Sequence, residues 1–127
     1  MINSENSEKV VSKNFINKTI NYLKKLGHVE IKADVKGYES PKSFEMKSEH
    51  LKITPDIVSV SSDGKVHYVE VGVKSENPVT LKSKWKCLKK LAEINNRGFK
   101  IVSHRGHYSF TDKLVIDLNY KQGATRI

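Results

Sequence analysis

The chain has 127 residues, which predicts a single domain (1–127) large enough to bury a hydrophobic core without disulfides. Its 23 Lys and Arg residues exceed its 14 Asp and Glu residues, and the formal net charge of +9 indicates a polyanionic partner, most often nucleic acid. A single cysteine excludes an internal disulfide and favours an intracellular, cytoplasmic setting, and the absence of a membrane-length apolar run or a signal-peptide core predicts no membrane partner.

The N-terminal part of the chain predicts one helix, one strand and one loop. Residues 1–6 are polar and predict a disordered end. From Ser7 to about Leu26, apolar residues recur at helical spacing along one stripe, and the following glycine predicts the helix end. HVEIKADV alternates as a strand does, whereas residues 36–52 have no clear period and predict a surface loop.

A β-hairpin is predicted next. The β-branched runs DIVSV and KVHYVEVGV flank the turn sequence SSDG. A three-residue loop with Gly64 in the left-handed conformation would pair Ser61 with Lys65. Counting outward from that pair places Asp56 opposite Glu70, while a slip of one residue would put the two acids on opposite faces.

The C-terminal part predicts a helix that begins at Asn77-Pro78 and ends before Gly98, because apolar residues line one side of it. FKIVSH predicts a strand, and KLVIDL predicts either a final strand or a short helix. The resulting order is α-β-β-β-α-β. We therefore expect an α/β fold with a mixed central sheet and flanking helices.

Polar residues on the second hairpin strand need an explanation, because Val69, Val71 and Val73 fill its other face. Opposed residues such as Asp56 and Glu70 have Cβ atoms about 4.5–5.5 Å apart, and two carboxylates that close repel each other unless a cation lies between them. Oxygen ligands suit Mg²⁺ or Mn²⁺. The structural alternatives are a turn residue after proline and a solvated charge pair.

The segments TPDIVSV and YVEVGVKS resemble the PD-(D/E)xK nuclease superfamily, in which a proline-aspartate on one strand is followed by acid-x-lysine on the next. The resemblance extends over most of residues 7–105, and small archaeal Holliday junction resolvases are the most similar members. It implies a restriction-endonuclease-like fold and a Mg²⁺- or Mn²⁺-dependent deoxyribonuclease. By the same resemblance, branched DNA is the leading substrate and the enzyme would be a homodimer. Duplex DNA, single-stranded DNA and RNA stay open as substrates.

The resemblance also implies roles for individual residues. Asp56 and Glu70 would hold the metal together with Val71, and Lys74 would orient the nucleophile or stabilise the transition state. A further catalytic acid would come from the first helix, where Glu8 is a better candidate than Glu5. The structural alternative for Glu8 is a favourable charge near a helix N-terminus.

Gly72 departs from the family spacing, because it stands where the acid two residues before Lys74 is expected. In a regular strand Glu70 and Lys74 would lie about 13 Å apart. Three explanations are open at this point: Gly72 permits a bulge that draws the two residues together, Lys74 reaches back with its flexible stem, or the site is degenerate.

Basic residues near the hairpin predict a nucleic-acid interface. Four lysines share one face of the second helix, with Lys84 nearby, and Arg105 lies in the segment SHRGHY. A solvated basic face is the structural alternative. Two other functions stay open: a non-catalytic nucleic-acid-binding protein on the same fold, and a basic interaction subunit of a larger assembly. The four lysines of the helix are Lys82, Lys86, Lys89 and Lys90.

Overall fold

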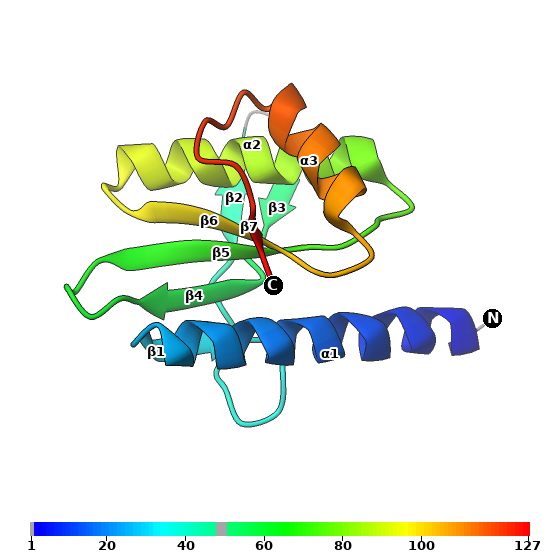
Figure 1. The fold of residues 1–127 in the computed structure, drawn as a ribbon, viewed down its shortest axis with the longest axis horizontal. Coiled ribbons are helices and arrows are strands. Elements are labelled where there is room, and N and C mark those ends of the chain that lie inside the picture. The colour runs from blue at the N-terminus through cyan, green and yellow to red at the C-terminus, as the bar shows by residue number, and fades with distance from the viewer. Residues whose placement is uncertain (1, 48–50) are drawn as a thin grey trace.

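The computed structural model describes residues 2–47 and 51–127, and the side chains of residues 2–12, 46 and 51 lie outside that description. A five-stranded sheet separates helix α1 on one face from helices α2 and α3 on the other (Figure 1). The elements are α1 Ile2–Lys25, β1 Val29–Ala33, β2 Phe44–Met46, β3 Leu51–Ile53, β4 Ile57–Val60, β5 Val66–Gly72, α2 Pro78–Ile94, β6 Gly98–Ser103, α3 Tyr108–Asp117 and β7 Thr125–Arg126.

The sheet is mixed, with the strand order β1-β4-β5-β6-β7. Strands β1, β4 and β5 are antiparallel neighbours, whereas β5, β6 and β7 run parallel. Helix α2 makes the crossover between β5 and β6, which is the usual connection between parallel strands. The predicted α/β class with a mixed sheet and flanking helices is therefore confirmed, and the restriction-endonuclease-like fold stays a prediction.

The hairpin register follows the sequence prediction. The Ser61 N–H donates to the Lys65 carbonyl at 2.9 Å, and Gly64 has a φ of +87° in the left-handed region. Ile57 pairs with Val69, so Asp56, one residue earlier, lies at the register position of Glu70. The turn chemistry thus sets which residues face each other at the far end of the hairpin.

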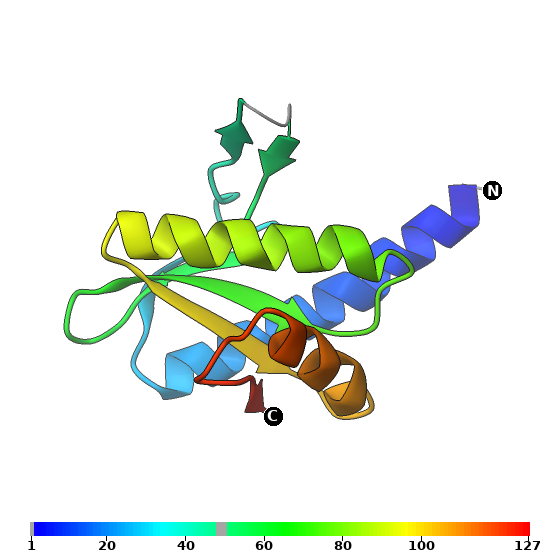
Figure 2. The ribbon, with the colours of Figure 1, turned by 90° about the horizontal axis from the view of Figure 1, so that it is seen from above.

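One segment differs from the sequence expectation, and for another the structure selects one of the two expected alternatives, the short helix. The predicted loop of residues 36–52 contains a two-stranded ribbon, β2 and β3, which projects from the body (Figure 2). The ribbon forms because Phe44 packs edge-on against Tyr68, with ring centroids 5.6 Å apart, and Ile53 joins the same cluster. KLVIDL lies in helix α3, where Leu114 packs against the sheet.

The bounds of the first helix also differ from the expectation. Helix α1 begins at Ile2, so residues 2–6 continue the helix where the polar composition predicts a disordered end. The helix ends at Lys25, close to the expected boundary, and Gly27 follows it with a φ of +90°. Within the described residues, no helix combines the length and the apolar character that crossing a membrane requires.

The alternation along β5 divides the core into two layers. Val69 and Val71 pack with Ile20 and Leu23 of α1 on one face. On the other face of the sheet, Trp85 of α2 and Leu114 of α3 pack with Ile101 of β6. Each fully buried large apolar side chain contributes roughly 1.5–3 kcal/mol of hydrophobic stabilisation. Both faces of the central strand are therefore covered, so a charged residue on it is removed from water.

Candidate active site

The two predicted acids meet at the C-terminal end of β5. Because β4 is antiparallel to β5, Asp56, which precedes β4, lies beside Glu70 near the end of β5. The start of α2 and the turn after β6 lie at the same end of the sheet, and the N-terminal half of α1 extends past it (Figure 1). This is the end at which ligands bind in open α/β sheets.

Backbone hydrogen bonds lock the two carboxylates in place. The Asp56 N–H donates to Glu70 Oε2 at 2.7 Å. In return, the Val71 N–H donates to Asp56 Oδ2 at 2.8 Å. These two bonds continue the pairing of β4 with β5 beyond the last ladder pair, with each carboxylate replacing a backbone carbonyl. The predicted proximity of Asp56 and Glu70 is confirmed.

Lys84 of α2 provides the cation between the two acids. Its Nζ lies 3.0 Å from Asp56 Oδ1 and 3.0 Å from Glu70 Oε1. The indole N–H of Trp85 also donates to Glu70 Oε1, at 3.0 Å. The Glu70 side chain is 0% exposed and that of Lys84 is 24% exposed. A buried carboxylate with three N–H donors is fully hydrogen-bonded, as burial of a charge requires.

Burial and mutual charge shift both ionisable partners. Burial and, second, the negative charge of Asp56 raise the pKa of Glu70 to about 8, although Lys84 opposes the shift. Burial alone would lower the pKa of Lys84, but the carboxylates of Glu70 and Asp56 outweigh it and raise that pKa above its ordinary value. Lys84 is therefore a cation throughout the physiological range, and Glu70 takes up a proton more readily than an exposed glutamate does.

Lys74 lies elsewhere than the sequence prediction placed it. Its side chain is exposed, and its backbone N–H donates to Nδ1 of His107 at 2.9 Å. Within the described residues, no ion pair joins Lys74 to Asp56 or Glu70, and Lys84 occupies that position instead. The sequence contained one signal for Lys84, because it directly precedes the buried Trp85 and borders the apolar stripe of α2.

The bulge proposed for Gly72 is wrong. Residues from His67 to Gly72 pair with β6 in continuous register, and Gly72 is aligned with Ser103. A Cβ on Gly72 would lie 2.8 Å from Cγ2 of Thr111 and 3.2 Å from the Ser103 Cα. The glycine is needed because α3 packs directly on this strand. It does not bring Lys74 closer to Glu70.

A divalent cation fits the donor set of the site. Mg²⁺ commonly takes one or two carboxylates plus water and phosphate oxygens, and Asp56 and Glu70 provide two carboxylates. The Val71 carbonyl faces the same side as its N–H, toward Asp56, because both groups of a strand residue point to one edge. The Lys84 ammonium occupies the position between the two carboxylates, so a metal ion bound by both would have to displace it.

Other acids do not extend this donor set in the described part of the chain. Among those residues, no group of three or more His, Cys, Asp and Glu side chains is placed to hold a metal ion. The predicted acid Glu8 lies in α1, but its side chain is outside the described residues. Its role as a catalytic acid therefore stays a prediction.

The predicted basic face on α2 is partly neutralised. Lys82 lies 3.8 Å from Asp117, and Lys89 lies 3.3 Å from Glu93. Lys86, Lys90 and Arg105 are exposed. Arg105 is at the tip of a tight turn after β6, which is closed by a 2.9 Å bond from the His107 N–H to the His104 carbonyl. Positive charge is thus available on two surfaces, the outer face of α2 and the end of the sheet.

Comparisons of the chain with protein-family models, with curated proteins and with solved structures found no match. The function is therefore inferred from the site and from the charge of the molecule. The site consists of the buried Glu70 with the partly buried Asp56 and Lys84, at the C-terminal end of β5. The molecule carries a net charge of +9.

Proposed function

We propose that the protein is a Mg²⁺- or Mn²⁺-dependent nuclease that hydrolyses phosphodiester bonds in DNA. One observation carries the proposal: the carboxylates of Asp56 and Glu70 converge on a single cation position at the C-terminal end of β5. The net charge of +9 favours a polyanionic substrate. The resemblance to PD-(D/E)xK nucleases supports the same function, with a restriction-endonuclease-like fold and branched DNA as the leading substrate.

The residues would divide the chemistry as follows. Asp56 and Glu70 would hold the metal ion, and the Val71 carbonyl is a further ligand candidate. When bound, the ion supplies an activated water and neutralises charge on the phosphate. Lys84, which contacts both carboxylates, is the lysine best placed to donate to a phosphate oxygen or to the nucleophile. Lys74 keeps this role as the prediction from the motif, and substitution separates the two candidates.

A specific observation favours a second function, that of a non-catalytic nucleic-acid-binding protein. In the buried cluster the Lys84 ammonium already neutralises the acids, and every carboxylate oxygen has a donor. Such a closed network holds α2 on the sheet without a metal ion. The basic subunit of a larger assembly is a third function, and DNA binding with a steep salt dependence separates it from the first two.

Cleavage of four-way and linear DNA with Mg²⁺ or Mn²⁺ tests the proposal. We expect Asp56→Asn and Glu70→Gln to lose cleavage by at least about 100-fold while they retain DNA binding, because each removes a metal ligand and no basic group. Lys84→Met should also lose cleavage, but it should still bind Mn²⁺ in calorimetry. Asp112→Asn is the matched control, since it removes an exposed carboxylate that pairs with Arg126.

Three results would discriminate further. At saturating DNA, Lys74→Ala should keep the parent kcat if Lys84 is the catalytic lysine, whatever it does to DNA affinity. A loss of kcat equal to that of Lys84→Met would instead make Lys74 the catalytic lysine. A parent protein that binds DNA but neither cuts it nor binds Mn²⁺ would be the non-catalytic alternative. The homodimer implied by the resemblance is tested separately by sedimentation equilibrium of the parent.

A further inference from the structure

A second group of polar residues lies at the same end of the sheet as the carboxylates, around the turn of residues 104–107. Two hydrogen bonds tie this turn to the exit of β5. The His104 N–H donates to the Gly72 carbonyl at 3.3 Å, and the Lys74 N–H donates to Nδ1 of His107 at 2.9 Å. The segment that carries Lys74 and the turn that carries Arg105 are therefore held side by side.

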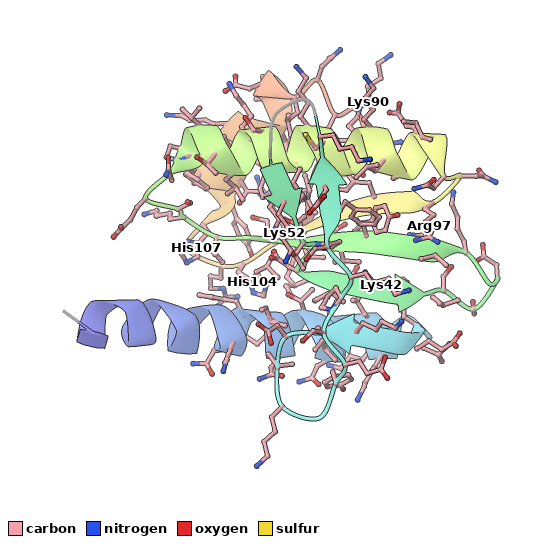
Figure 3. All side chains as sticks on the ribbon, turned by 180° about the vertical axis from the view of Figure 1, so that it is seen from behind. Lys42, Lys52, Lys90, Arg97, His104 and His107 are labelled. Atoms are coloured by element: carbon pink, nitrogen blue, oxygen red, sulfur yellow. The ribbon has the colours of Figure 1, made fainter. Side chains whose placement is uncertain are left out.

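Helix α1 is packed against this turn through aromatic and polar contacts. The Phe15 ring meets the imidazoles of His104 and His107 edge-on, with centroids 4.9 Å and 5.2 Å apart. The Thr19 hydroxyl lies 2.8 Å from Nε2 of His104. Lys18 places its Nζ 5.7 Å from the centroid of the Phe15 ring. Figure 3 shows both histidines beside α1, between the helix and the end of the sheet.

Three cations thus gather around one turn: Lys18 from α1, Lys74 after β5, and Arg105 at the tip of the turn. All three are exposed, and none has an ion pair within the described residues. The nearest acid in sequence, Glu76, is exposed and has no ion pair with them. On α2, by contrast, two of the four predicted lysines are already neutralised by acids.

Burial and the neighbouring cations both keep the two imidazoles of this turn uncharged. Burial and, second, the positive charge of Lys18 lower the pKa of His104 to about 4. Burial and Lys74 likewise lower the pKa of His107. Both histidines are therefore neutral at physiological pH, and the excess positive charge at this end comes from the three cations. A region of positive charge with no nearby partner attracts phosphate.

We propose that Lys18, Lys74 and Arg105 form a phosphate-contact surface that holds a nucleic-acid strand at the end of the sheet. Lys74 lies four residues beyond Glu70 and two beyond Gly72, where β5 ends, so the two Cα atoms are at most about 14 Å apart, or about four nucleotides at 3.4 Å rise. The surface would therefore hold the strand a few nucleotides from the carboxylates. The proposal deepens the proposed function and rests on its nucleic-acid substrate, but not on cleavage.

Binding measured without metal tests this surface separately from catalysis. The full chain is titrated into fluorescein-labelled single-stranded and duplex DNA of 20 nucleotides in EDTA, at several salt concentrations between 50 and 200 mM. The test variant is Lys18→Gln/Lys74→Gln/Arg105→Gln. The control, Lys25→Gln/Lys36→Gln/Lys65→Gln, removes the same charge from exposed residues outside this turn. Circular dichroism verifies that both variants are folded.

We expect the test variant to bind at least about 10-fold more weakly than the control at 100 mM salt. The slope of log affinity against log salt should become shallower by about 2 for single strands and about 3 for duplex. Binding through three fewer phosphate contacts releases fewer counterions. Equal losses in the two variants would overturn the proposal, since net charge alone would then explain them.

The failure of this proposal and the failure of the nuclease function give different results. A parent that never cuts DNA, combined with a selective binding loss in the test variant, retains the surface and rejects the enzyme. A parent that cuts DNA, combined with a test variant that binds as the control does, rejects the surface and retains the enzyme. Unchanged binding in both variants also rejects the surface and moves the contact to other basic residues.

Discussion

His104 is a buried histidine whose proton position follows from its neighbours. The Thr19 hydroxyl donates to the Phe15 carbonyl at 2.8 Å, so Thr19 Oγ1 has no hydrogen left for the ring of His104. Nε2 of His104, 2.8 Å away, must therefore donate to Thr19, which fixes a neutral tautomer with its proton on Nε2. Only 3% of this residue is exposed, and its neutral form holds α1 on the turn after β6.

This histidine should make the protein sensitive to mild acid. Its pKa is about 4 in the folded protein and 6.5 in the unfolded chain, so the unfolded chain takes up the proton first as the pH falls. The free energy of unfolding is highest well above pH 6.5 and falls by about 3 kcal/mol as the pH drops from there through 4. Urea unfolding of the parent and of His104→Gln measures it. The variant should show a smaller decrease over this range, and an equal decrease would contradict the prediction.

Lys84 makes a second prediction at the same scale. Lys84→Met leaves Asp56 and Glu70 without their shared cation, so the free energy of unfolding should fall by about 3–5 kcal/mol at pH 9. Because the pKa of Glu70 is raised to about 8, protonation removes the repulsion at low pH, and the loss should be much smaller at pH 5. Urea unfolding at pH 5, 7 and 9 measures the trend.

The exposed neighbour Lys86 provides the control for this experiment. Lys86→Met removes a lysine from the same helix without touching the carboxylates, and it should change stability by less than about 0.5 kcal/mol at every pH. A Lys84→Met loss of the same size at pH 5 and pH 9 would contradict the electrostatic account. It would then reflect packing of the lysine stem.

At the scale of elements, β5, α2, β6 and α3 form one unit, and Gly72 shows how tightly it is packed. Thr111 of α3 occupies the space that a side chain on Gly72 would need. Its hydroxyl donates to the His107 carbonyl at 2.9 Å, which fixes the side chain. Helix α3 therefore approaches the backbone of β5 directly, and the loop that leads to α2 leaves the sheet at the same point.

A double-mutant cycle tests this contact. We expect Gly72→Ala to destabilise the protein by about 1–3 kcal/mol, because its Cβ would lie 2.9 Å from Thr111 Oγ1. Thr111→Ala removes the obstruction, so the double variant should be at least about 1 kcal/mol more stable than the sum of the single effects. Urea unfolding of all four proteins gives the coupling. Additive effects would show that the contact does not limit this position.

Local signals were enough to predict the hairpin and the pairing of the acids. SSDG fixed the loop length and the left-handed glycine, and the alternating valines of β5 fixed which face is buried. Counting residues outward from this turn then places Asp56 opposite Glu70. The helix start at Asn77-Pro78 was equally local, because proline is favoured in the first turn.

Features that depend on tertiary contacts were not predictable in this way. Strands β2 and β3 have three residues each, too few for a period to show, and the packing of Phe44 on Tyr68 decides them. Lys84 is in α2, and this helix lies over the two acids only because it connects the parallel strands β5 and β6. The role of Gly72 depends on Thr111, 39 residues further along the chain, which no local pattern shows.

For the whole molecule, the uneven charge is the dominant electrostatic feature. Apart from the buried cluster, the ion pairs among the described residues are at the surface, where each contributes at most about 1 kcal/mol. The net charge of +9 acts over longer distances and repels itself in the compact state. Salt should therefore affect stability more through this repulsion than through the pairs.

Raising NaCl from 20 to 300 mM should increase the melting temperature by a few degrees, because the Debye length falls below the spacing of many surface charges. Differential scanning calorimetry of the DNA-free protein measures the shift. The charge-reduced variant Lys25→Gln/Lys36→Gln/Lys65→Gln should respond less. A melting temperature that falls with salt would show that the surface ion pairs outweigh the repulsion.

The two outer strands of the sheet also limit how the protein can associate with itself. β1 carries an extra residue relative to β4, with Glu30 at a φ of +49°, and such a bulge twists an exposed edge away from further pairing. At the opposite edge, β7 has only two residues. The Tyr120 hydroxyl donates a hydrogen bond to the Phe99 carbonyl of β6, so that carbonyl is not open to another strand. Neither border offers a long template for adding a strand. A homodimer would therefore join through helices or loops rather than through one continuous sheet.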